Sequence, residues 1–192
     1  MLLALAGPAT AQLASPAAQT TPAATPPSAP VPAAILPNTH RLTRDLKADT
    51  DNIKSQGNFG AQLWLVADPQ FFQNWRKPDS PSLDPVEAAV RGQPLYTVIV
   101  FYGPARDAKS QASVTYDLVV RRPDGSVYAE NKDLVGCQSP APADERMLCL
   151  GRDHLNITLA PDDPAGKYTI EATVRDNVGK AAVTLKQAFT AP

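Results

Sequence analysis

The chain has 192 residues, which suits one domain with an appendage, because a single domain takes roughly 100–200 residues. Its 18 Lys and Arg nearly balance its 19 Asp and Glu, and no basic run or basic stripe interleaved with aromatic residues occurs. This excludes the electrostatic footprint of a nucleic-acid-binding protein. No apolar run approaches the roughly 20 residues that a membrane-spanning helix needs, so we predict a protein that is not membrane-spanning.

The first 11 residues, MLLALAGPATA, combine a short apolar run with the small-x-small pattern Ala9-Thr10-Ala11, which a signal peptidase cuts before Gln12. The apolar run is short and no Lys or Arg precedes it. We therefore expect residues 1–11 to be a partial signal peptide whose upstream half is missing, and the protein to be periplasmic or secreted. An Ala-rich terminus without this role would have a similar sequence.

Residues 12–37 consist almost entirely of Ala, Pro, Thr, Ser and Gln and include seven prolines. Prolines remove backbone donors and favour extended polyproline II, so this stretch is predicted to be a disordered tether. A leader without any function has the same composition.

Residues 38–58 are predicted to form a linker or a short helix. Asn38 or Thr39 could cap such a helix, and Leu42, Leu46 and Ile53 would lie near one face.

From residue 59 the pattern changes to short alternating segments rich in β-branched and aromatic residues, which is typical of strands. These segments are 62–66, 95–102, 114–120, 126–130, 155–159, 168–174 and 182–189. Residues 95–102 are almost continuously apolar, as expected of a central strand that is covered on both faces or strongly buried on one. About seven strands with intervening turns predict that residues 59–192 form an all-β, Ig-like antiparallel β-sandwich, closed by a hairpin that runs from Tyr168 to Phe189.

A short helix is predicted after the first of these strands. Asp68 and the proline that follows it suit a helix start, and the Lys-Pro pair beginning at Lys77 predicts its end. Phe71, Phe72 and Trp75 would share one side of this helix. They either plug one open end of the sandwich or form an exposed partner-binding patch, and burial distinguishes the two.

Two cysteines, Cys137 and Cys149, lie in one short segment. An even cysteine count in an exported chain predicts a disulfide, with a pair of free thiols as the alternative. A metal site is not predicted, because the spacing is not CxxC and the chain has only two histidines, His40 and His154.

No motif commits the chain to a reaction. Gly-x-Ser-x-Gly, GxxxxGK and GxGxxG are all absent from the sequence, and we expect neither catalytic residues nor a cofactor. His154 beside Asp153 is most simply a histidine at a strand end.

Two turns carry oxygen ligands that calcium could use. Asp162 and Asp163 precede the strand 168–174, and Asp176 and Asn177 follow it. Because a strand rises about 3.3 Å per residue, these two turns lie too far apart for one ion. No joint calcium site is predicted.

The stretch DDPAGKYTIEATVRDNVGK resembles the closing strand and turn of bacterial Ig-like modules of the polycystic-kidney-disease type. RRPDGSVYAEN, followed by a strand and DDPAGKY, is similar to macroglobulin-like sandwich domains. The resemblance covers roughly residues 114–189 and implies the sandwich fold and roles as spacer, adhesion or docking units. It does not include the macroglobulin thioester, because Gly136-Cys137-Gln138 differs from Cys-Gly-Glu-Gln.

The expected function is a non-enzymatic, exported protein-binding or structural module of the cell envelope, whose partner is another envelope or extracellular protein. The alternative is a glycan or cell-wall binding module, in which exposed Trp64, Trp75 or Tyr128 stack on sugar rings. A small hydrolase with unsignalled residues, such as one built on His154, is the third hypothesis.

Overall fold

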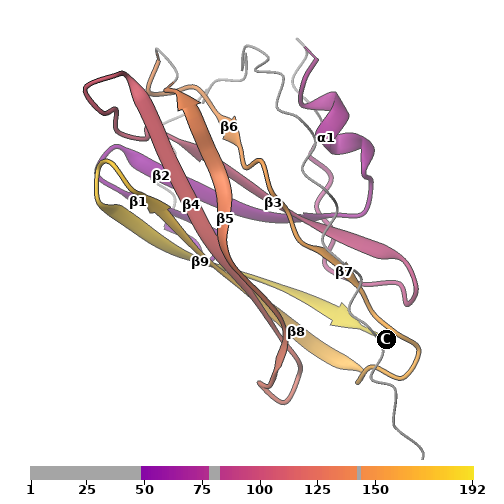
Figure 1. Ribbon diagram of the computed structural model, residues 1–192. Coiled ribbons are helices and arrows are strands. Elements are labelled where there is room, and N and C mark those ends of the chain that lie inside the picture. The colour runs from indigo at the N-terminus through magenta and orange to yellow at the C-terminus, as the bar shows by residue number, and fades with distance from the viewer. Residues whose placement is uncertain (1–48, 78–82, 142–143) are drawn as a thin grey trace, which may run out of the picture. The chain divides into compact units, whose positions relative to one another are not determined.

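The computed structural model describes residues 49–77, 83–141 and 144–192 (Figure 1). The predicted signal peptide, the tether and residues 38–48, which include Leu42 and Leu46, lie outside the described residues. The described part contains one short helix and nine strands. They are β1 (Ile53–Gln56), β2 (Phe59–Val66), α1 (Gln70–Asn74), β3 (Pro94–Tyr102), β4 (Gln111–Arg121), β5 (Val127–Pro140), β6 (Cys149–Leu150), β7 (Asn156–Thr158), β8 (Gly166–Asp176) and β9 (Ala181–Ala191).

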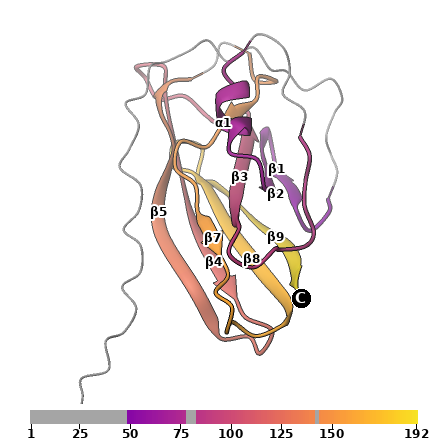
Figure 2. The ribbon, with the colours of Figure 1, turned by 90° about the vertical axis from the view of Figure 1, so that its right-hand side faces the viewer.

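The strands form two antiparallel sheets. The first has the order β1-β2-β3-β6, with β7 also paired to β3, and the second has the order β5-β4-β8-β9. The two sheets pack face to face in both views (Figures 1 and 2). This confirms the predicted all-β sandwich with a short helix.

Alternating burial in β4 and β8 explains how the core forms. Both strands bury every second side chain along their length, because successive residues of a strand point to opposite faces. The inward side chains are Val114, Tyr116, Leu118 and Val120 of β4 and Tyr168, Ile170, Ala172 and Val174 of β8. They meet inward residues of β2 and β3, such as Leu63 and Phe101, in the main core.

The hairpin of β8 and β9 closes the second sheet. Its register runs without a shift from Gly166 opposite Ala191 to Asp176 opposite Ala181, and it places Tyr168 opposite Phe189. The two rings stack with centroids 5.2 Å apart. The predicted closing hairpin is therefore confirmed, and its register is a finding of the structure.

The segment predicted as a linker or short helix contains β1, so Ile53 lies in a strand and not on a helix face. The Gly57-Asn58 pair forms the tight turn between β1 and β2, with Gln56 opposite Phe59 and Gly57 at φ 61°. A two-residue turn of this kind needs a positive φ, which glycine adopts readily. The described sandwich consequently starts earlier than residue 59.

The edges of the second sheet are protected. On β9, the N–H of Lys186 donates to the carbonyl of Asp51 and the N–H of Thr190 donates to that of Glu87. On β5, three register shifts interrupt the pairing with β4. Bulges and edge contacts of this kind discourage pairing with another chain.

The outer face of the second sheet carries ion pairs between neighbouring strands. Asp117 of β4 pairs with Arg175 of β8, and Asp117 also accepts the N–H of Asp133 at 3.0 Å. The hydrogen bond from Arg175 lowers the pKa of Asp117, and burial opposes this effect only in part. The carboxylate is thus stabilised in its charged form.

Replacing Asp117 with asparagine should lower the free energy of unfolding by about 0.5–1 kcal/mol at neutral pH, the usual worth of such a pair. A carboxyl with a lowered folded pKa stabilises the protein above its unfolded pKa of about 4, and the stabilisation is lost as pH falls through the folded pKa. Urea unfolding of both proteins at pH 7 and at about pH 2.5 compares their stabilities with and without most of this contribution. Equal differences between the variant and the wild type at the two pH values would contradict the ion-pair explanation.

Candidate functional site

A second apolar cluster lies on the outer face of the sheet that contains β2 and β3. Its buried members are Val66, Phe71, Val98 and Val100. Trp64, Phe72, Trp75, Leu83, Tyr96, Leu148 and Leu150 pack against them and stay partly exposed. Strand β3 is thus covered on both faces, which is the first of the two alternatives that its continuous apolar sequence allowed. We call Trp64, Phe72, Trp75, Tyr96 and His154 the aromatic surface.

Helix α1 brings two of these rings to the surface. The carboxylate of Asp68 accepts the N–H of Gln70 at 2.8 Å, and the carbonyl of Asp68 accepts the N–H of Phe71 at 3.2 Å. These bonds start the helix where the sequence predicted a start. The N–H of Trp75 then donates to the carbonyl of Phe71 and ends the short helix.

The position of α1 differs from the predicted plug. The helix packs on the outer face of the sheet and does not cover an open end of the sandwich; Figure 2 looks onto α1 with β3 behind it. Phe71 is 5% exposed and anchors the helix, whereas Phe72 and Trp75 are half-buried. The three residues predicted as one patch therefore divide into an anchor and two surface rings.

His154 extends the aromatic surface beyond the helix. Its ring stacks on Phe72 with centroids 4.2 Å apart and planes inclined by 20°, and the ring of Tyr96 lies 6.0 Å from it. Loss of solvent lowers the pKa of His154, and the charge of Asp153 acts in the opposite direction. An exposed, mostly neutral imidazole beside two rings is suited to stacking contacts.

The neighbouring Asp153 faces the other sheet. One carboxylate oxygen accepts the N–H of Val135 at 2.8 Å and the other accepts Nε of Arg152 at 3.1 Å. Its carbonyl accepts the hydroxyl of the buried Tyr116, and burial raises the pKa of that phenol. Asp153 thus joins the two sheets.

The three aromatic residues considered for sugar binding do not share one surface. Trp64 and Trp75 pack against the same outer cluster, and the indole N–H of Trp64 donates to Gln62 at 3.0 Å. Tyr128 instead packs against the main core, edge-on to Tyr168. Tyr128 therefore lies apart from the two tryptophans.

Tyr128 belongs to a polar cluster near the start of β8. Its hydroxyl donates to Asp163 at 2.9 Å, and Arg122 lies over its ring. Burial raises the pKa of Tyr128 to about 12, and the hydrogen bond to Asp163 adds to this. These contacts fix the phenol in place.

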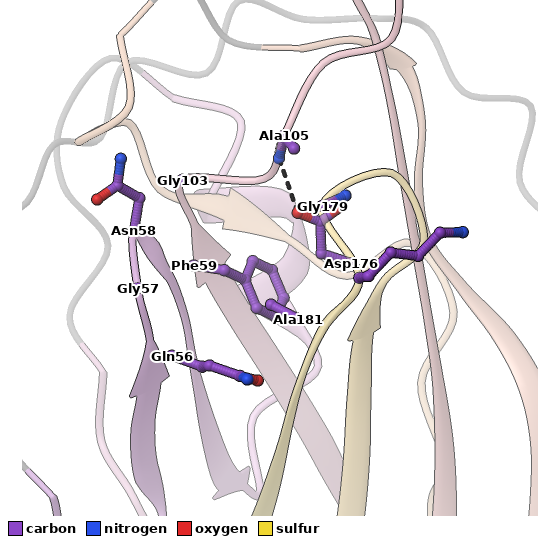
Figure 3. A pocket seen from close by; sticks show the side chains of 10 residues that line it. Gln56, Gly57, Asn58, Phe59, Gly103, Ala105, Asp176, Gly179 and Ala181 are labelled. Atoms are coloured by element: carbon purple, nitrogen blue, oxygen red, sulfur yellow. Dashed lines mark hydrogen bonds between the residues drawn. The ribbon is translucent and has the colours of Figure 1, made fainter.

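A recess of about 360 Å³ opens at one end of the sandwich (Figure 3). It lies among the β1–β2 turn, the segment after β3 and the β8–β9 turn, and Phe59, Ala105 and Ala181 contribute apolar lining. Asp176 is 2% exposed and accepts the N–H groups of Ala105, Val178 and Gly179 at 2.8–3.1 Å. The buried carboxylate therefore organises two loops. From the sequence, Asp176 is a candidate only as a calcium ligand.

The acidic turns flank opposite ends of β8, which spans Gly166–Asp176. Asp163 accepts the N–H of Ala160 and the hydroxyl of Tyr128, and Asp176 binds the backbone of its own turn and of Ala105. Within residues 49–77, 83–141 and 144–192, no group of three or more His, Cys, Asp or Glu is arranged to hold a metal ion. In the same ranges, no helix is long and apolar enough to cross a membrane.

The two cysteines lie in different sheets. Cys137 is on β5 and half-buried, and Cys149 is on β6 and buried. Both pack in the main core. No disulfide is recorded among the described residues, so the predicted bond stays a prediction.

Comparisons with known proteins place the chain near no family. No family model and no curated protein matches the sequence. Among solved structures, a family 123 glycoside hydrolase from Clostridium perfringens is similar at 12% identity and a TM-score of 0.41, over 71% of this chain and 27% of that one. The chain thus spans about a quarter of that enzyme's length. A Niemann-Pick type C2 protein from Japanese carpenter ant is similar at 13% identity and a TM-score of 0.34, over 53% of this chain and 76% of that one.

Proposed function

We propose that this protein is a non-enzymatic, exported binding module of the cell envelope that docks another protein through its aromatic surface. The observation that carries the proposal is the placement of α1. The helix buries Phe71 against the sheet and leaves Phe72 and Trp75 half-buried beside Tyr96 and His154. Large, rigid aromatic rings of this kind dominate the binding energy of protein interfaces.

The contacts within the aromatic surface also hold it in one conformation. Phe72 meets Phe71 edge-on at 5.7 Å and Tyr96 at 6.0 Å, and His154 stacks on it. Trp75 lies 5.8 Å from the ring of Phe71. A surface whose rings are already ordered loses little conformational entropy on binding, which favours docking.

Photo-crosslinking in the native envelope tests this proposal. A photoreactive phenylalanine analogue at position 72 should capture one protein partner, and the same analogue at Val127, which is 48% exposed on β5, should not. With the captured partner in hand, Trp75→Ala should weaken binding about 10–30-fold, as expected of an aromatic contact of this size. The matched Val127→Ala variant should bind normally.

Two results would contradict the proposal. One is a partner that binds the wild type and a Phe72→Ala, Trp75→Ala double variant with equal affinity. Cooperative thermal unfolding of the double variant would show that it is folded. The other is turnover of ester, peptide or glycoside substrates that disappears in His154→Ala, because that result would assign His154 to catalysis.

Glycan binding is the second candidate, favoured by the position of Trp64 and Trp75 on one outer cluster. It predicts that cell-wall oligosaccharides quench or shift tryptophan fluorescence in wild type and not in Trp75→Ala. A saturable sugar response together with no crosslinked protein would favour this candidate over protein docking.

A further inference from the structure

The two cysteines face the same part of the core from opposite sheets. Cys137 lies opposite Val114 of β4, and Cys149 lies opposite Phe101 of β3; both of these partners are fully buried. Residues directly opposite each other on neighbouring strands point to the same face of a sheet. The side chains of Cys137 and Cys149 therefore both point into the space between the sheets.

Val114 and Phe101, the residues opposite the two cysteines, both lie close to Gly136. A Cβ atom there would lie 2.9 Å from Cγ1 of Val114 and 3.3 Å from Cε1 of Phe101. Residues from both sheets thus close on the backbone just before Cys137. Any side chain at Gly136 would separate them.

The sheets come together at this edge. Packed sheets lie about 10 Å apart, whereas the Cα atoms of a disulfide lie about 4.4–6.8 Å apart. Here the N–H of Arg152 donates to the carbonyl of Gly136 at 3.2 Å, and that of Asp153 donates to the carbonyl of Val135 at 3.1 Å. Main chains in direct hydrogen-bond contact bring the segment directly after β6 closer to β5 than the usual spacing of packed sheets.

We propose that Cys137 and Cys149 form a disulfide that joins the two sheets and fixes the segment 149–158 against both of them. The bond forms when the two thiols give up two protons and two electrons to a disulfide oxidant by thiol–disulfide exchange. The oxidant is released as a dithiol. Export to an oxidising compartment supplies oxidants of this class.

The proposed bond lies behind the aromatic surface. Segment 149–158 pairs with β3 at both ends, through β6 and β7, and carries His154 against Phe72 between them. Fixing β6 to β5 would limit the movement of His154. The inference shares with the proposed function the premise of export, but it does not depend on the docking partner, because it concerns only the two sulfur atoms.

Peptide mapping tests the bond directly. Trypsin cleaves after Lys132, Arg146 and Arg152, which places the two cysteines in the separate peptides 133–146 and 147–152. Full-length protein purified from an oxidising compartment without reductant, alkylated in denaturant and digested, should yield these peptides joined to each other. Reductant should separate them. Alkylated single peptides without reductant, or peptides joined to a second chain, would overturn the proposal.

Stability and hydrogen exchange test the structural role. Reduction should lower the melting temperature by about 10 °C, because the unfolded chain regains the entropy that the closed loop had removed. It should also speed amide exchange in residues 149–154 more than in β8. A Cys137→Ser, Cys149→Ser variant should match the reduced protein and ignore reductant. If that variant does not fold, the peptide map of the wild-type protein still shows whether the disulfide is present. An unchanged melting temperature after complete reduction would contradict the structural role.

Discussion

Replacing Tyr168 with alanine is expected to lower the free energy of unfolding by about 3–5 kcal/mol, the usual cost of truncating a buried aromatic side chain. The ring is fully buried, stacks on Phe189 and meets Tyr128 edge-on. Its hydroxyl donates to the carbonyl of Pro164 at 2.9 Å. The truncation thus removes core volume and a hydrogen bond that holds the turn before β8, and urea unfolding measures the loss.

Two further variants separate the ring from the hydroxyl. Tyr168→Phe keeps the packing and should cost only about 1 kcal/mol, the net worth of one hydrogen bond. Lys167→Ala, at the exposed neighbouring position on the other face of β8, should be nearly silent. Similar, small effects for Tyr168→Ala and Lys167→Ala would contradict the observed register.

An unbroken alternation predicted the long strands β4 and β8, and a continuous apolar run predicted β3. The alternations of β4 and β8, and the turn before β9, gave strands and a hairpin that the structure reproduces. Strand β5 was predicted only to residue 130 but continues to Pro140. The reason is physical: register shifts along β5 break the period of two on which the prediction depends.

The short strands β1 and β6 were not predicted, for a different reason. β6 has two residues, and its pairing depends on β3, which is distant in the sequence. β1 left a local signal in the Gly57-Asn58 turn, since glycine and asparagine between two extended segments are typical of a tight hairpin. That signal could have identified β1.

The candidate site was only partly predictable. The aromatic spacing identified Phe71, Phe72 and Trp75, because a helix brings residues three and four apart together. The contact of Phe72 with His154 joins residues 82 positions apart in the chain, and no local pattern encodes it. Nor could the sequence say which face of the sheet α1 covers, because that depends on the outward apolar residues of β2 and β3 together.

Replacing Asp176 with alanine should lower the free energy of unfolding by about 2–4 kcal/mol, because buried donors left without a partner each cost about 1–3 kcal/mol. The three N–H groups involved belong to Ala105, Val178 and Gly179. The recess beside them (Figure 3) admits water to part of the site. For this reason the expected loss of unfolding free energy is smaller than the full cost of leaving three buried N–H groups without a partner.

Asp176→Asn distinguishes the carboxylate's two oxygens. One oxygen accepts Val178 and Gly179, and the other accepts Ala105. An asparagine can keep its carbonyl toward the turn, but its NH₂ group then faces the N–H of Ala105, so we expect about half the loss of unfolding free energy seen with alanine.

Asp162→Ala, in the exposed turn at the other end of β8, should change the free energy of unfolding by less than about 0.5 kcal/mol. Urea unfolding of all three variants provides the comparison, and an Asp176→Ala protein as stable as Asp162→Ala would show that the carboxylate does not hold the loops together.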